Sequence, residues 1–216
     1  MYDLHGIIFA YSASPELGEL VRRRTAASIP FCGRYRLIDF ALSSMMNAGI
    51  RDVGVIMQRD YQSLLDHIGS GKNWDMSRRY GGLRMLPPFG LPEYHRGNYT
   101  GTIEALNAVA PYVRSIPQKH IALLLGSVCA NIDLTAAMRQ HVKTGAEITA
   151  ICSAGELTGS NHRYVIGDDG MVKQLLFDRT DPGEGIPSLE GYIINKDTLL
   201  RIMDKCKALN LYRFHK

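Results

Sequence analysis

The first candidate site is a loop that has the setting of a phosphate-binding loop but not its residues. An apolar run at 6–10, GIIFA, leads into it at the place where α/β proteins usually hold phosphate-binding glycines. The loop instead carries Tyr11, Ser12, Ser14 and Glu16. These residue types leave three alternatives open: an unusual active site, an altered binding site, or a site that has lost its chemistry.

Cysteine and histidine give no further catalytic or metal motif. The four cysteines include no CxxC pair and the seven histidines show no HExxH spacing, so we assign no metal site to them. Cys129 and Cys152 stand beside apolar runs and are expected to be buried, reduced thiols, which predicts a cytoplasmic protein. The N-terminal apolar run is too short for a signal peptide, and no run is long enough to cross a membrane.

Composition is that of one ordinary globular domain. The chain has 216 residues, of which 45% are hydrophobic, and this is enough for a sizeable core. The formal net charge of +4 fits an anionic small-molecule ligand at least as well as a nucleic acid. The charge alone decides nothing, and we expect no nucleic-acid partner and no membrane partner.

Short apolar runs alternate with segments of helical period, and this alternation predicts the frame that positions the loop. Strands are expected at 6–10, 52–57, 81–88, 120–125, 146–153 and 188–194, with a hairpin at 163–177. Helices are expected at 35–50, 60–71, 103–113, 133–145 and 196–209. The pattern predicts an α/β fold: a mostly parallel mixed sheet with helices on both faces and an antiparallel appendage in the last third. Because ligands bind beyond the carboxyl ends of such strands, segments 11–25, 58–61 and 126–133 are expected on the functional edge.

Several motifs carry a family resemblance. The segments IPFCGRYRLIDFALSSMMNAGI, GNYTGTIEAL and LLLGSVCANID follow one another in the order found in glucose-1-phosphate adenylyltransferases, the ADP-glucose pyrophosphorylases. The resemblance implies a Rossmann-like nucleotidyltransferase domain and the conversion of ATP and glucose 1-phosphate to ADP-glucose with magnesium. It also implies that residues 1–216 are this domain, truncated at its C-terminal end and without the C-terminal β-helix domain of the family.

Against that family, the phosphate loop is altered at each important position. The family motif G-G-x-G-[ST]-R has its glycines at Tyr11, Ser12 and Ser14 and its arginine at Glu16, while Ala26 replaces a lysine. Glycine lets the backbone pass close to phosphates and offer its N–H groups, and a β-carbon blocks that approach. A carboxylate ~4 Å from a phosphate repels it by about 4 kcal/mol at an effective dielectric of about 20.

The metal and sugar positions are altered as well. Ser127 replaces the magnesium-binding aspartate of the family motif L-x-G-D, and Asp133 is expected to cap the next helix. No cofactor is expected, and magnesium only if the protein is active. On the sugar side Ser188 and Tyr192 match the family, but Glu190 replaces a glycine and would disfavour an anionic sugar phosphate.

Three residues match the nucleotide side of the family. Gln58 is expected at a strand end, where it could contact a nucleotide or simply a loop, and the two alternatives are about even. Gly101 and Thr102 match the adenine-side segment, although helix capping alone would explain Thr102.

Five residues are candidates for an anionic effector or a partner subunit. They are Arg22, Arg23, Arg24, Arg36 and Trp74. A solvated basic face is the simpler explanation for the arginines, and core packing is at least as good an explanation for the tryptophan.

The losses, combined with an intact scaffold, predict a protein that no longer performs the family reaction. Our first hypothesis is a non-catalytic, regulatory (GlgD-type) subunit that pairs with a catalytic glucose-1-phosphate adenylyltransferase in a hetero-oligomer. Two alternatives remain: an active nucleotidyltransferase with unusual phosphate contacts, and a sensor that binds a nucleotide or sugar phosphate.

Overall fold

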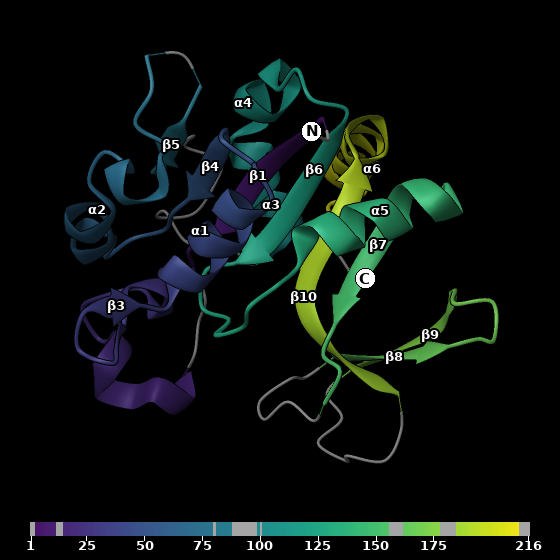
Figure 1. Cartoon of the computed structure of the whole chain (residues 1–216), viewed down its shortest axis with the longest axis horizontal. Coiled ribbons are helices and arrows are strands. Elements are labelled where there is room, and N and C mark those ends of the chain that lie inside the picture. The colour runs from purple at the N-terminus through teal and green to yellow at the C-terminus, as the bar shows by residue number, and fades with distance from the viewer. Residues whose placement is uncertain are drawn as a thin grey trace.

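A sheet of eight strands forms the centre of the computed structural model (Figure 1). The structure describes residues 3–11, 15–79, 81–87, 99, 101–155, 162–177 and 185–211. The strands follow the order β5-β4-β1-β6-β10-β8-β9, and β7 also pairs with β10. Their bounds are β1 Leu4–Phe9, β4 Val53–Ile56, β5 Leu83–Leu86, β6 His120–Leu125, β7 Ile148–Cys152, β8 His162–Ile166, β9 Val172–Phe177 and β10 Ile186–Asn195. A small separate hairpin joins β2 Pro30–Phe31 to β3 Tyr35–Arg36.

The sheet is parallel in its first half and antiparallel in its last third. Strands β5, β4, β1 and β6 are all parallel neighbours, whereas β10 is antiparallel to β6, β7 and β8, and β8 is antiparallel to β9. The expected hairpin at 163–177 is confirmed as β8 and β9, which extend away from the main sheet in Figure 1. The fold class expected from the sequence is therefore confirmed.

Helices cover both faces of the sheet. Their bounds are α1 Ile38–Asn47, α2 Gln62–Ile68, α3 Thr102–Ala108, α4 Ala110–Ser115, α5 Leu134–Thr144 and α6 Lys196–Ala208, with short 3-10 segments η1 Pro15–Val21, η2 Ala26–Ser28 and η3 Lys72–Trp74. Side chains of α1, α2 and α5 form one core cluster, and side chains of α3, α4 and α6 form a second. Strand β1 alternates between them, because Ile8 belongs to the first cluster while Ile7 and Phe9 belong to the second.

Helix α5 begins and ends as its sequence predicts. Asp133 is the N-cap, and its Oδ1 accepts a hydrogen bond from the backbone N–H of Ala136 at 2.9 Å. Gly145 follows the helix with φ 64°, the left-handed conformation that glycine adopts without strain. The expected role of Asp133 as a cap is confirmed.

The expected helix at 103–113 is different in two respects. Thr102 is its first residue rather than its cap, and the N-cap is Gly101, whose backbone is extended. The helix is also interrupted at Val109, and Pro111 lies in the first turn of the second part, α4. Proline has no N–H to donate and favours a first turn, so the break lies just before it.

The four cysteines are free thiols, and only part of the burial prediction holds. Cys129 is exposed because it lies in the loop after β6, beyond the apolar run that suggested burial. Cys152 ends β7 and is half-buried, and burial raises the pKa of its thiol. Among the described helices, none combines the length and apolar character needed to span a membrane.

Candidate functional site

The expected functional edge coincides with the switch point of the sheet. From β1 the chain adds β4 and β5 on one side and then returns to add β6 on the other. The ends of β1 and β6 therefore lie side by side: Phe9 pairs with Leu125, and the N–H of Gly126 donates to the carbonyl of Phe9 at 2.9 Å. In open α/β sheets ligands bind in the crevice at such a point.

Tyr11 follows β1 at this point and turns its ring back into the domain. The ring packs edge to face against Phe9 and Tyr99, with centroids 5.9 and 5.3 Å away. Its hydroxyl is buried without a hydrogen-bond partner of good geometry, although the neighbouring Thr102 slightly opposes the effect of burial. Burial is the main cause that raises the pKa of Tyr11 far above its usual value, so the phenol stays neutral.

The ring of Tyr11 lies beside the segment that the sequence assigns to the nucleotide. Gly101 and Thr102 begin helix α3 there, and Tyr11 packs against the core cluster to which this helix contributes. Gln58, two residues after the end of β4, is half-buried on the same edge. The structure therefore places all three nucleotide-side candidates at the carboxyl edge. Ser12, Ser14 and the side chain of Glu16 lie outside the described residues.

The lysine position of the family is closed by packing. Ala26 lies in η2 and is completely buried. Its neighbour Ala27 packs closely on the end of β6, since a β-carbon added at Gly126 would lie 3.2 Å from the Ala27 Cβ. A lysine at position 26 would have to bury its stem or displace this packing.

The residues present do not fit a catalytic magnesium ion. Ser127 is half-buried just after β6 and offers a neutral hydroxyl where magnesium chemistry needs a carboxylate. The nearby carboxylate of Asp133 already accepts the capping hydrogen bond of α5. The described part of the chain contains no group of three or more His, Cys, Asp or Glu side chains that could hold a metal.

A chain of hydroxyls connects the sugar-side candidates. Ser188 is buried, and its Oγ lies 3.4 Å from the hydroxyl of Tyr164, which lies 2.9 Å from the hydroxyl of Tyr192. Burial, together with the neighbouring Tyr164, raises the pKa of Tyr192 far above its usual value. These hydroxyls connect β8 to β10 and fix the start of β10.

Glu190 lies in a bulge of β10, close to the end of β6. The register with β7 shifts between Ser188 and Gly191, and Glu190 has φ 50°, in the left-handed region. Its carboxylate Oε1 lies 3.2 Å from Nδ1 of His162 on β8. The sequence matched this position to a glycine, and the backbone conformation explains why a glycine would suit it.

The effector and partner candidates separate into two groups. Trp74 is only 6% exposed and belongs to a core cluster, so the core-packing alternative describes it. Arg36 is half-buried, and its guanidinium donates to the carbonyls of Ser28 and Ser63 at 3.1 and 2.9 Å, which ties η2 to α2.

The basic segment at the end of η1 remains accessible. Arg22 and Arg23 are exposed and Arg24 is half-buried. Arg22 pairs with Glu19 at 3.1 Å, an exposed contact of small energetic value. Arg22 and Arg23 are the effector candidates most accessible to solvent.

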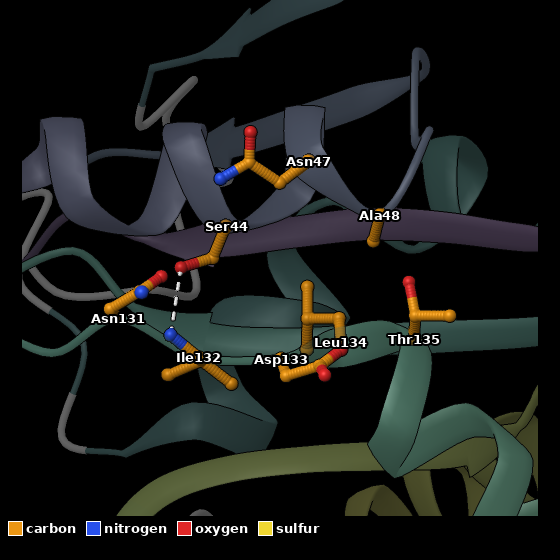
Figure 2. Close-up of a pocket in the computed structure, with 8 residues that line it drawn as sticks. All are labelled: Ser44, Asn47, Ala48, Asn131, Ile132, Asp133, Leu134 and Thr135. Carbon is orange, nitrogen blue, oxygen red and sulfur yellow. Dashed lines mark hydrogen bonds between the residues drawn. The ribbon is translucent and has the colours of Figure 1, made fainter.

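One cavity is lined in part by residues 131–133, the last part of the segment that the sequence places on the functional edge, although no cavity was predicted there. It has a volume of about 230 Å³ and lies between α1 and the start of α5 (Figure 2). The Oγ of Ser44 reaches across and accepts a hydrogen bond from the N–H of Ile132 at 3.2 Å. The available signal was Ser44 itself, a polar residue on the apolar face of its helix.

The fold and its edge define the class of protein. The largely parallel sheet, with a switch point where β1 lies between β4 and β6, is that of an open α/β domain that binds ligands at its carboxyl edge. Residues 6–173 match the family described as Nucleotidyl transferase, and the chain belongs to that family.

Its relatives narrow the group within the family. The chain is 37% identical over 178 residues to the "Glycogen biosynthesis protein GlgD" of Geobacillus stearothermophilus, covering 82% of this chain and 50% of the relative. It is 30% identical over 208 residues to a "Glucose-1-phosphate adenylyltransferase" of Thermomicrobium roseum, covering 95% and 48%. The chain thus spans about half the length of the curated relatives that it matches.

A solved structure agrees on the fold. A Bacillus anthracis crystal structure that carries the name glucose-1-phosphate thymidylyltransferase superposes with a TM-score of 0.71, covering 92% of this chain and 74% of that one. The two sequences are 14% identical, so the likeness concerns the fold alone.

Proposed function

We propose that this chain is the nucleotidyltransferase-type domain of a non-catalytic, regulatory subunit that acts in glycogen biosynthesis in the cytoplasm. It pairs with a catalytic glucose-1-phosphate adenylyltransferase and tunes the activity or effector response of that enzyme. The names of its relatives support the pathway, since one is a glycogen biosynthesis protein and another the adenylyltransferase.

Tyr11 carries the non-catalytic part of the proposal. A phosphate loop needs a backbone that can approach the ligand closely and point N–H groups at it. Here Tyr11, the second residue after β1 and the position of the first family glycine, holds a ring packed against Phe9 and Tyr99. The ring fills space beside the start of α3, and moving it to open a phosphate loop there would expose apolar surface.

The residues at positions 26 and 127 also disfavour catalysis. Adenylyl transfer needs cations to neutralise charge on the phosphates as it develops. Ala26 and Ser127 are neutral at the two positions where the family has a lysine and a magnesium-binding aspartate. The scaffold around them is retained, with both core clusters closely packed. Such a domain keeps the surface and shape that a homologous subunit recognises while the reaction is left to the partner.

The test is an assay of ADP-glucose synthesis by a catalytic homologue, with and without the full-length protein. We expect a change in rate, substrate affinity or effector response that saturates with the protein added. An unrelated protein at the same concentration is the control and should change nothing.

The same assay, combined with a nucleotide-binding titration of this protein, separates the alternatives. Magnesium-dependent synthesis by this protein alone would establish an active nucleotidyltransferase. Tight nucleotide binding without any effect on the homologue would indicate a sensor. Either result would overturn the regulatory proposal.

A further inference from the structure

Glu190 has a backbone conformation that residues other than glycine rarely adopt. Its φ of 50° lies in the left-handed region, where glycine is free of strain and a glutamate is not. Such residues persist when the surrounding structure holds them in place, and they gather at functional sites. The conformation of Glu190 therefore calls for a physical account of what holds it and what it does.

The bulge in β10 holds the backbone of Glu190. The register with β7 pairs Ser188 with Cys152 and Gly191 with Ile151, so the residues between them bulge out. The N–H of Glu190 donates to the Oγ of Ser188 at 2.8 Å. A bulge of this kind re-aims a side chain, and here the side chain is a carboxylate.

His162 fixes the carboxylate from the neighbouring strand. The Nδ1 of His162 lies 3.2 Å from Oε1 of Glu190, and the side chains are 16% and 34% exposed respectively. The His162 ring is itself packed edge to face on Phe177 of β9, with centroids 5.3 Å apart. Glu190 is thus held by a packed neighbour while part of its side chain still reaches solvent.

The register places this carboxylate at the ligand-binding edge. Tyr192 pairs with Leu123 of β6 in an antiparallel ladder, so Glu190 is near the level of Leu125, the last residue of that strand. The carboxyl end of β6 forms one side of the switch point. An anionic group that enters the crevice from the β10 side would meet a fixed negative charge.

We propose that Glu190, positioned by His162, is a specificity determinant that excludes sugar phosphates from the crevice at the carboxyl end of β6, beside β10. The exclusion comes from the charge of the carboxylate. The inference deepens the proposed function and rests on it in taking this edge as the sugar side. It assigns to a single residue the loss of the phosphorylated substrate, independently of Tyr11 and the nucleotide.

The test compares three variants of the full-length protein in titrations with glucose 1-phosphate. Glu190→Gln removes the charge and keeps the size, and Glu190→Gly also removes the left-handed strain. Asp75→Gly is the matched control, because Asp75 is an acidic residue at φ 54° whose carboxylate also pairs with cations, Arg51 and Arg78. Asp75 lies next to Met76, whose carbonyl accepts a hydrogen bond from the first residue of β5. Strand β5 is the outermost strand of the sheet on the side away from β10.

We expect both Glu190 variants to bind glucose 1-phosphate at least tenfold more tightly than the wild type, measured by NMR titration to millimolar concentrations. Asp75→Gly should bind like the wild type. Glucose is the uncharged probe, and its affinity should change less than twofold in Glu190→Gln. Both glycine variants should raise the unfolding midpoint, which shows that they fold and that strain is released in each.

Three results would overturn the proposal. They are no gain in either Glu190 variant, a gain in the glycine variant alone, and an equal gain for glucose in Glu190→Gln. The readout needs no catalytic partner, so its failure is distinguishable from failure of the regulatory proposal.

Discussion

The hydroxyl of Tyr11 is one of the buried polar groups without a hydrogen-bond partner in the described part of the chain. It is buried with no partner among the described residues, while the ring beneath it packs on two aromatic neighbours. A buried polar group without a partner destabilises the fold, whereas the buried ring stabilises it. The ring therefore stabilises the fold, whereas its hydroxyl does not.

Removal of that hydroxyl should therefore do no harm. We expect Tyr11→Phe to leave the free energy of unfolding unchanged or to raise it by up to about 1 kcal/mol. Tyr112→Phe is the control, because the hydroxyl of Tyr112 bonds Nε2 of His5 at 2.8 Å and its loss should cost about 1 to 2 kcal/mol. Urea unfolding measures both. A loss for Tyr11→Phe as large as that for the control would show that its hydroxyl has a partner.

Ser127 allows a second prediction at the residue scale. Ser127→Asp restores the family carboxylate after β6 but leaves Tyr11 and Ala26 in place. We expect no ADP-glucose synthesis by this single variant, because the phosphates would still lack their loop and their lysine. Measurable turnover in a magnesium-dependent assay would show that the loop changes matter less than we argue.

At the scale of elements, two helix starts that look alike in sequence differ in the structure. Asp133 caps α5 with its side chain, whereas Thr102 lies inside α3 with its hydroxyl near Tyr11. An N-cap contributes about 1 kcal/mol through the backbone N–H that it satisfies. A hydroxyl in the first turn that bonds no backbone N–H contributes less.

The difference can be measured by truncation of each side chain. Asp133→Ala should lower the free energy of unfolding by about 1 kcal/mol, and Thr102→Ala should lower it by clearly less. Thermal or urea unfolding of the two variants provides the comparison. If the two losses were equal, or that of Thr102 the larger, the assignment of the caps would be wrong.

The strands and most helices were predictable because their signals are local. β-Branched and apolar runs gave the strands, and Asp133 and Gly145 gave the ends of α5. Other features depend on residues distant in the chain. The contact of Tyr11 with Tyr99 and the pair of Glu190 with His162 arise only when the strands assemble. The exposed Cys129 shows that an apolar neighbour in sequence does not ensure burial in space.

At the scale of the whole molecule, stability in acid depends on a buried histidine. His5 in β1 is 4% exposed, and burial is the main cause that lowers its pKa from 6.5 to about 4, while Asp52 opposes the shift. In the unfolded chain the His5 side chain binds a proton near pH 6.5, whereas in the folded protein it does so only near pH 4. The stability that His5 contributes is therefore complete above about pH 6.5 and is lost as the pH falls toward 4.

We expect the free energy of unfolding to fall as pH decreases from 6.5 to 5, with a total loss from His5 of about 3 kcal/mol by pH 4. His5→Gln keeps a donor toward Tyr112 but cannot titrate, so its pH profile should be flatter. A smaller slope should remain from His141, whose pKa is also lowered by burial. Identical profiles for His5→Gln and the wild type would contradict the assignment.

The central claim is that this edge no longer performs phosphate chemistry, and release of pyrophosphate by the protein alone tests it most directly. The full-length protein is incubated with ATP, glucose 1-phosphate and magnesium, and pyrophosphate is measured against a protein-free control. The account predicts no release above that control. Magnesium-dependent release that disappears in Ser127→Ala would contradict it, because the hydroxyl after β6 would then take part in catalysis.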